Sequence, residues 1–247
     1  ESFLAEQMEV VDPDALHASR NALRKALASA HKDALLATYR KLENKGPYSP
    51  DPASIGRRAL RNTCLGYLAE LGEAKLVYAQ YEGADNMTDA MAALTWLAHL
   101  DCPERQKALD AFHAKWKDEP LVVDKWLAVQ AGSRLPDTLS RVRSLLGHPA
   151  FNIKVPNKVY ALIRTFAANH ARFHAADGGG YAFLADQVIA LNSLNPQVAA
   201  RMARGFDRWK KFDAGRQATA RAQLERIRDS EGLTKDVAEI VTKALAG

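Results

Sequence analysis

The spacing of apolar residues is helical along nearly the whole chain. In residues 14–30, Leu16, Leu23 and Leu27 fall on one helical face, whereas Arg24 falls elsewhere. Apolar residues three, four and seven positions apart are what a half-buried helix presents to its core. The same period predicts further helices at 33–44, 55–71, 73–82, 87–100, 103–117, 121–131, 136–146, 157–168, 180–191, 196–211, 214–229 and 234–246.

Prolines and polar residues mark several helix ends. Asp12 followed by Pro13 predicts a helix start, because the carboxylate accepts from unpaired N–H groups and proline fits the first turn. Residues 46–52 contain three prolines and are therefore predicted to form a loop, and Ser54 is predicted to cap the next helix.

Signals for strands are almost absent, since no β-branched run alternates and no Asn-Gly hairpin turn occurs. The sequence therefore predicts an all-α fold. We expect an irregular superhelical, solenoid-like stack of antiparallel helix pairs, with roughly a dozen helices joined by short turns. We expect residues 1–247 to form a single domain.

The composition is that of a globular protein. Of 247 residues, 47% are apolar and 26% are charged, which suffices for a sizeable core without disulfides or metals. Cys64 and Cys102 lie in apolar helical context and are predicted to be free, buried thiols, which favours a reducing, cytoplasmic location. No secretory segment or long apolar run is present, so we predict no membrane association. The chain begins at Glu1 rather than Met, and we expect an excised fragment.

The sequence contains none of the common catalytic motifs. A nucleophile elbow, a P-loop, a dinucleotide glycine fingerprint and a Cys-x-x-Cys pair are all missing. We therefore predict no catalytic residue in this chain. The net charge of +5 is small for this length and bears on association rather than on fold.

One pair of histidines has the spacing of zinc ligands. His170 and His174 are four residues apart, as in zinc peptidases, but Ala171 stands where the general-base glutamate would be. We interpret the pair as capping a helix C-terminus, and we predict no metal site. Residues 178–180 are three glycines that would suit a phosphate cradle, but a flexible turn before a helix also explains them.

A stripe of polar residues runs along the predicted helix at 196–211. Gln197, Arg201, Arg204 and Arg208 recur at spacings of four, three and four, which places them on one face. A solvated basic face is one interpretation, and a surface that binds carboxylates through arginine is another. Phosphate contacts to nucleic acid are a third, but no nucleic-acid motif accompanies the charge, and we predict no such partner.

Several stretches resemble one family. Residues 86–94, Asn-Met-Thr-Asp-Ala-Met-Ala-Ala-Leu, resemble the "NNMTDAxAAL" stretch of the bacterial aminopeptidase N family, and residues 121–126 are similar to its "LVxDKW". Further matches occur in order along the chain at Arg61-Asn62, Cys64-Leu65, Pro156-Asn157, Phe173-His174-Ala175, Asp177-Gly178, Tyr181, Leu191-Asn192-Ser193, Asn195-Pro196-Gln197-Val198-Ala199 and Thr242-Lys243-Ala244-Leu245. Together they cover essentially the whole chain, which resembles the C-terminal domain of that family.

This resemblance implies a domain of a zinc-dependent exopeptidase that removes N-terminal residues from peptides. In the family, a thermolysin-like domain of the same polypeptide holds the zinc ligands and the general base. The C-terminal domain closes over it and leaves a chamber that admits peptides. The resemblance thus implies zinc in the parent enzyme, no cofactor in this fragment, and two partners, which are the catalytic domain and peptide substrates.

The resemblance also implies three substrate-binding residues. Gln197 and Arg201 match the glutamine and arginine of the family's "NPQVAxR" stretch, and Lys158 matches the basic residue of its "PNR" stretch. Lysine lacks the planar, bidentate geometry of arginine, so the match is weakest at Lys158. The alternative function is a stand-alone helical scaffold that binds peptides or proteins.

Overall fold

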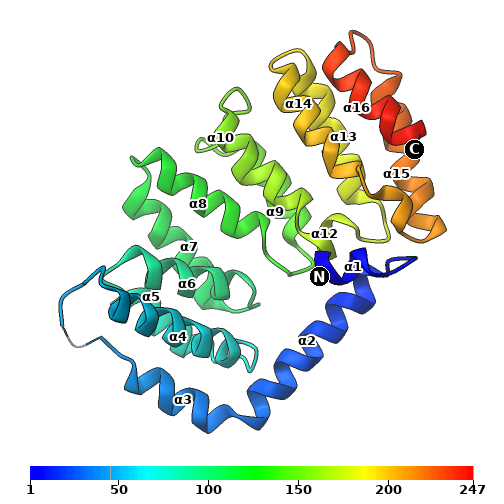
Figure 1. Ribbon diagram of the computed structural model, residues 1–247. Coiled ribbons are helices and arrows are strands. Elements are labelled where there is room, and N and C mark those ends of the chain that lie inside the picture. The colour runs from blue at the N-terminus through cyan, green and yellow to red at the C-terminus, as the bar shows by residue number, and fades with distance from the viewer. Residues whose placement is uncertain (45, 247) are drawn as a thin grey trace. The chain divides into compact units, whose positions relative to one another are not determined.

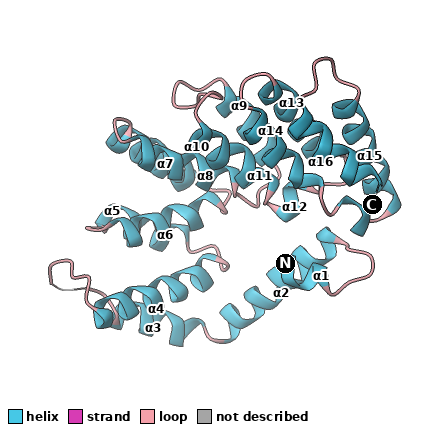
Figure 2. Ribbon diagram, turned by 45° about the horizontal axis from the view of Figure 1, so that its top comes forward, coloured by secondary structure: helices cyan, strands magenta, loops and turns pink. Residues whose placement is uncertain are grey.

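The computed structural model describes residues 1–44 and 46–246. Regular secondary structure within these ranges is helical (Figure 2). The exception is one isolated parallel bridge between Val11 and Phe212. The predicted all-α fold is confirmed. The numbered helices exceed the predicted dozen because some are very short: α1 (Ser2–Glu6), α10 (Pro156–Val159), α11 (Thr165–Ala167) and α12 (His170–Phe173).

The chain divides into two compact units, Ala18–Trp116 and the combination of Glu1–His17 with Lys117–Gly247. The first contains most of α2 and five further helices (Figure 1): α2 (Pro13–Ala30), α3 (Lys32–Lys41), α4 (Pro52–Ala69), α5 (Ala74–Gly83), α6 (Met87–Ala98) and α7 (Pro103–Trp116). Helix α3 packs on α4, α5 on α6, and α6 on α7. Consecutive helices therefore pair as predicted, both across the long connection between α3 and α4 and across the shorter turns between the other helices.

The core of the first unit lies between α4, α6 and α7. Its fully buried side chains are Leu65, Leu68, Leu94, Leu97 and Phe112. Helix α4 comes close to α6 at Gly66, where a Cβ atom would lie 2.5 Å from the ring of Trp96. A side chain at this position would push the two helices apart, because the ring is already in contact with the backbone.

The stretch at residues 86–94 contributes hydrogen bonds that connect helices of this unit. Asn86 caps α6 by accepting from the backbone N–H of Asp89 at 2.9 Å. The carboxylate of buried Asp89 accepts from Asn62 at 2.8 Å, and Gln80 donates to the Asn62 amide oxygen at 2.7 Å. These bonds link polar groups of α4, α5 and α6, which explains the polar residue types at these positions, although Oε1 of Gln80 has no hydrogen-bond partner among the described residues.

The second unit contains α1, the start of α2, and the remaining helices: α8 (Pro120–Ala131), α9 (Thr138–Leu146), α10 to α12, α13 (Gly179–Asn192), α14 (Pro196–Ala203), α15 (Ala214–Arg228) and α16 (Lys235–Ala246). Helix α13 packs on α14 and α15, and α14 packs on α16 (Figure 1). The core is rich in aromatic rings that pack edge to face, with Phe166 at 5.3 Å from Phe183 and Phe173 at 5.3 Å from Tyr181 between ring centroids.

Helix starts follow the predicted chemistry, with one correction. Asp12 accepts from the N–H of Ala15 at 2.9 Å, so the predicted cap is confirmed. The cap of α4 is Asp51, not Ser54 as predicted, and its carboxylate accepts from the N–H of Ser54 at 2.9 Å. Pro52 occupies the first turn, where its missing N–H costs nothing, and this moves the helix start ahead of the predicted one.

Two predicted helices are interrupted. Within the predicted helix 157–168, residues Tyr160–Arg164 form a π-helical turn, labelled η1. The predicted helix 196–211 ends at Ala203 and continues as two short 3₁₀ turns, η2 (Arg204–Phe206) and η3 (Trp209–Lys211). Gly205 lies at the break, where a Cβ atom would meet Leu184 at 2.6 Å, and glycine is a poor helix former.

Both cysteines are free, as predicted. Cys64 is buried in α4, whereas Cys102 is only partly buried, so the prediction of burial is confirmed for the first thiol alone. Burial raises the pKa of both thiols. Their neutral form is therefore favoured, which suits structural cysteines.

Candidate functional site

The structure places Gln197 and Arg201 one turn apart on α14, and both side chains are exposed. Asn195 caps this helix by accepting from the N–H of Val198 at 3.1 Å, and Pro196 follows it in the first turn. The motif Asn195-Pro196 thus sets the residue at which α14 begins. The start of the helix in turn fixes the face on which Gln197 and Arg201 lie.

Arg201 contacts a second element of the same unit. Its Nη1 donates to the phenolic oxygen of Tyr160 at 2.9 Å. Tyr160 is the first residue of the π turn, and Lys158 lies two residues before it in α10. The structure therefore brings α14 beside the segment that carries Lys158.

Lys158 is already paired. Its Nζ lies 2.8 Å from a carboxylate oxygen of Asp124 on α8 and donates to the carbonyl of Pro120 at 3.1 Å. The Lys158 and Asp124 side chains are only 12% and 17% exposed, so little water screens the ion pair. This pair connects the family stretch at 121–126 with the family stretch at 156–158.

The predicted four-residue stripe does not run along one continuous helix. Helix α14 ends at Ala203, so Arg204 and Arg208 lie beyond it. Arg204 pairs with Asp207 at 3.1 Å, and Arg208 pairs with Glu6 of α1. The glycine at position 205 was the one sequence signal for this break, since it falls in the middle of the predicted helix.

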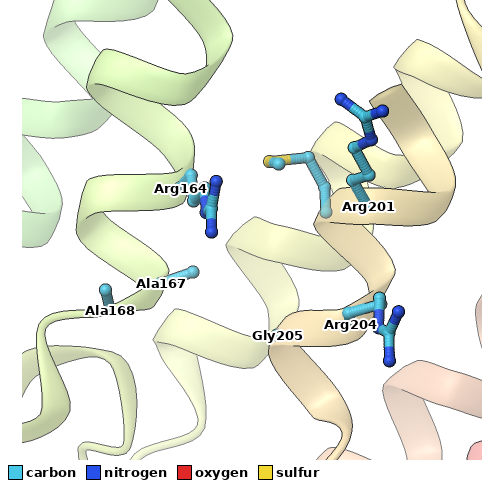
Figure 3. A pocket seen from close by; sticks show the side chains of 7 residues that line it. Arg164, Ala167, Ala168, Arg201, Arg204 and Gly205 are labelled. Carbon is cyan, nitrogen blue, oxygen red and sulfur yellow. The ribbon is translucent and has the colours of Figure 1, made fainter. Parts of the chain in front are cut away.

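A cavity of about 560 Å³ adjoins Arg201. Arg164 stands on one side of it, and Arg201 and Arg204 stand on the other (Figure 3). We call it the arginine cavity, and it is lined by Arg164, Ala167, Ala168, Arg201, Met202, Arg204 and Gly205. Arg164 was missed from sequence, because it lies in a helical run without a motif and only folding places it opposite α14.

Arg164 is the last residue of the π turn that Tyr160 begins. A π turn adds one residue to a helical turn and so rotates the following residues by about 100° around the axis. Thr165 donates its hydroxyl to the carbonyl of Tyr160 at 3.3 Å, across the same turn. The Arg164 guanidinium carbon lies 5.9 Å from the centre of the Tyr160 ring. Tyr160 thus contacts two of the three arginines.

His170 and His174 pack against aromatic rings. Their ring centroids are 4.9 Å apart and the ring planes meet at 63°, and His174 stacks on Phe212 at 4.0 Å. Nδ1 of His174 lies 2.8 Å from the Tyr181 hydroxyl. Burial, together with the nearby charges of His170 and Arg216, lowers the pKa of His174 to about 3. The ring is therefore neutral at neutral pH, and interaction with a helix dipole as a cation does not explain it.

The run of glycines at 178–180 has a structural explanation. Gly178 has a φ of +69°, which favours glycine, and it precedes α13. A Cβ atom on Gly180 would lie 2.2 Å from the carbonyl oxygen of Phe173. The backbone passes too close for any side chain. Among residues 1–44 and 46–246, no group of three or more His, Cys, Asp or Glu side chains is arranged to hold a metal ion.

The fold and the site together define a class of protein, an all-helical repeat domain with a basic cavity between two of its helical segments. A family described as "Domain of unknown function (DUF3458_C) ARM repeats" matches residues 1–246. The chain belongs to this family. ARM repeats are stacked helices, in agreement with the predicted solenoid class.

Comparison with individual proteins shows which members of the family this chain is similar to. The chain is 41% identical over 249 residues to aminopeptidase N of Caulobacter vibrioides, covering 99% of this chain and 29% of that protein. It is 42% identical over 248 residues to aminopeptidase N of Escherichia coli, covering 98% of this chain and 28% of that protein. The chain thus corresponds to the C-terminal helical part of aminopeptidases N and spans less than a third of their length.

A solved structure agrees. The crystal structure of Legionella pneumophila aminopeptidase A in complex with aspartic acid matches with a TM-score of 0.90 and 31% identity, over 98% of this chain and 30% of that one. The predicted family membership is confirmed. Within the described part of the chain, no helix is both long enough and apolar enough to cross a membrane.

Proposed function

We propose that this chain is the C-terminal domain of a zinc aminopeptidase, in which it caps a catalytic domain of the same polypeptide and bounds the chamber where peptides are hydrolysed. The observation that carries the proposal is the identity of 41–42% to two aminopeptidases N over at least 98% of this chain. In this proposal the zinc ion and the general base belong to the catalytic domain, and residues 1–247 act as one domain with it.

Gln197, Arg201 and Lys158 are the peptide-positioning groups of the proposal. Gln197 and Arg201 are exposed on one face of α14, where a bound peptide can reach them. A guanidinium has five N–H donors, and the bond to Tyr160 uses one nitrogen, so Arg201 retains donors for a ligand. Lys158 acts beside them with its ammonium held by Asp124.

Peptides are the proposed substrates, and the cytoplasm is the proposed location. The solved relative binds aspartic acid, which supports free amino acids or peptide ends as ligands. Two free thiols without a disulfide support a reducing compartment.

The test is a series of peptides of increasing length given to the zinc-loaded polypeptide that carries this chain. Arg201→Ala is expected to lower kcat/KM about tenfold for the longer peptides, because a charge-assisted bond is lost. Hydrolysis of the shortest substrate and the zinc content are expected to stay constant. Arg221→Ala is the matched control, since Arg221 is an exposed arginine that pairs with Glu225 on α15. An unchanged dependence on peptide length would exclude this role for Arg201.

The stand-alone scaffold is tested in the same experiment. A scaffold would bind a peptide as tightly in the 247-residue chain as in the longer polypeptide, and the polypeptide would show no hydrolysis. Tighter binding in the polypeptide, together with release of N-terminal residues, supports the capping role.

A further inference from the structure

We propose that the outer face of α2 is a docking surface for an amphipathic helix of the same polypeptide, outside residues 1–247, whose edge carries acidic side chains. The surface consists of Leu23 and Leu27 with Ala26 and Ala30 beside them, and we call it the α2 face. The inference depends on the proposed function for the existence of the longer polypeptide, and not for its peptidase activity.

The two leucines of the α2 face point away from the unit to which they belong. Leu23 is 62% exposed and Leu27 is 40% exposed, and they lie one helical turn apart. Their spacing predicts contact with the core, and the structure contradicts that prediction. Ile55 and Leu60 of α4 are exposed too, but a separation of five residues places them on different sides of their helix. Adjacent exposed leucines form a continuous apolar surface, whereas single ones are ordinary.

Polar contacts hold the opposite face of α2. Arg24 donates from Nε to a carboxylate oxygen of Glu70 at 2.8 Å. The Arg24 guanidinium carbon also lies 4.8 Å from the centre of the Tyr67 ring and 5.2 Å from the centre of the Trp96 ring. Ala28, one turn further along the same side, is fully buried. Turning α2 to bury its leucines would break these contacts, so the apolar face is held outward.

An apolar outer face indicates a helix in the interior of a stack. In proteins built from stacked helical repeats, each repeat packs on its neighbours, and the repeats that close the stack have a polar outer face. The chain belongs to a family of such repeats, yet the outer face of α2 is apolar. The chain covers only 29% of the Caulobacter aminopeptidase N, so most of that polypeptide lies outside the matched part. A helix from the rest of the polypeptide is therefore the occupant that the stack requires.

The shape of the α2 face suits a second helix. Ala26 and Ala30 are exposed beside the two leucines. Helices pack when the side chains of one fill the grooves between the side chains of the other. The small alanines leave such a groove next to Leu23 and Leu27, so a helix with its own apolar stripe can approach closely.

Charge decides between a segment of the polypeptide and a second copy of the chain. Residues 18–30 contain three basic side chains and no acidic one. Arg24 is balanced by Glu70. Arg20 is exposed and lies one turn before Leu23. Two copies packed through the α2 face would bring like charges together, whereas an acidic edge on the covering helix would attract Arg20.

Thiol labelling tests the proposal. Leu23→Cys places a thiol in the α2 face, and Lys25→Cys places one at an exposed position about 160° around the same helix. Each variant is made in the 247-residue chain and in the longer polypeptide, and peptide mass spectrometry follows maleimide labelling at each position. We expect the thiol at position 23 to react at least about tenfold more slowly in the polypeptide, because labelling then requires local opening. The thiol at position 25 is expected to react equally in both.

A charge variant tests the acidic edge. In the polypeptide that carries Leu23→Cys, Arg20→Glu is expected to speed labelling at position 23 about threefold, the effect of losing an exposed ion pair. Lys25→Glu makes the same change of charge on the far side of the helix and is expected to have no effect. Circular dichroism and urea unfolding of the 247-residue chain verify that each variant keeps its helices. An unchanged rate in Arg20→Glu would exclude the acidic edge.

A photocrosslinking amino acid at position 27 of the polypeptide identifies the covering segment. The crosslinked peptide is expected to come from outside residues 1–247 and to combine apolar residues at helical spacing with acidic ones. A crosslink confined to residues 1–247 would overturn the proposal.

Equal labelling at position 23 in the chain and in the polypeptide would also overturn it. So would labelling that slows in the 247-residue chain as its concentration rises, because the cover would then be a second copy. The two proposals fail separately. Fast labelling at position 23 in a polypeptide that hydrolyses peptides would exclude the docking surface alone. Slow labelling in a polypeptide without peptidase activity would exclude the aminopeptidase role alone.

Discussion

Arg201 donates a hydrogen bond from Nη1 to the phenolic oxygen of Tyr160 at 2.9 Å, and this bond joins two residues 41 positions apart. It connects α14 to the π turn at Tyr160–Arg164. π turns inside α-helices are frequent at functional sites. The contact therefore gives the two halves of the arginine cavity a common support.

Tyr160→Phe removes the acceptor while keeping the ring. We expect it to lower the free energy of unfolding by less than about 1 kcal/mol, because the bond is exposed to water. A double-mutant cycle with Arg201→Ala measures the coupling between the two side chains. Urea unfolding gives the stability term, and kcat/KM for a long peptide gives the functional term. Strictly additive effects in both measurements would contradict a positioning role for Tyr160.

Asp124→Asn leaves the Lys158 ammonium in a partly buried position without its counter-charge. The two atoms lie 2.8 Å apart, and both side chains are mostly shielded from water. We expect the free energy of unfolding to fall by about 1–3 kcal/mol. Lys158→Met retains the stem and removes the charge, so the double variant is expected to recover part of the loss. Chemical denaturation of the single and double variants measures both changes, and no recovery in the double variant would contradict this account.

The lowered pKa of His174 predicts how the stability of the folded protein depends on pH. Its pKa is lowered to about 3 in the folded protein by burial and by the nearby charges of His170 and Arg216, whereas the ordinary value is 6.5. The unfolded chain therefore binds a proton at a higher pH than the folded chain does. The stability that neutral His174 contributes is present above pH 6.5 and is lost as the pH falls from 6.5 toward 3.

The slope from this one group approaches about 1.4 kcal/mol per pH unit within that interval. His174→Gln is expected to be less stable at neutral pH, because it disturbs the contact with Tyr181 at 2.8 Å, and to lose stability less steeply on acidification. Urea midpoints at a series of pH values check this, with the exposed His31→Gln as the matched control. Parallel profiles for the wild type and His174→Gln would show that another group controls the slope.

The helices were predictable because their signals are local. Leu65, Leu68, Leu94 and Leu97 recur at helical spacing, and all are fully buried in the first unit. Asp12 satisfies N–H groups within one turn of its own position, so neighbouring residues suffice to place that helix start. The prediction of Ser54 as the cap was wrong because two possible acceptors, Asp51 and Ser54, lie close together in the sequence. Pro52 favours a helix that begins directly after Asp51.

The candidate site was predictable only in part. Gln197 and Arg201 share a face, as their spacing of four requires, but the helix that carries them ends at Ala203. Arg204 was assigned to the same face, whereas it follows the end of α14 and pairs with Asp207. Their role in binding peptides stays a prediction, as does that of Lys158.

Residue order alone thus specified an all-helical chain, most of its helix ends, and the family to which it belongs, because backbone hydrogen bonds and capping act within a few residues. Tertiary packing decided the rest. It placed Arg164 opposite Arg201, with Tyr160 between them, and it paired Lys158 with Asp124. It also buried His174 against Phe212. Each of these contacts joins segments that are distant in the chain, and their energies depend on the shape and burial of surfaces that exist only after folding.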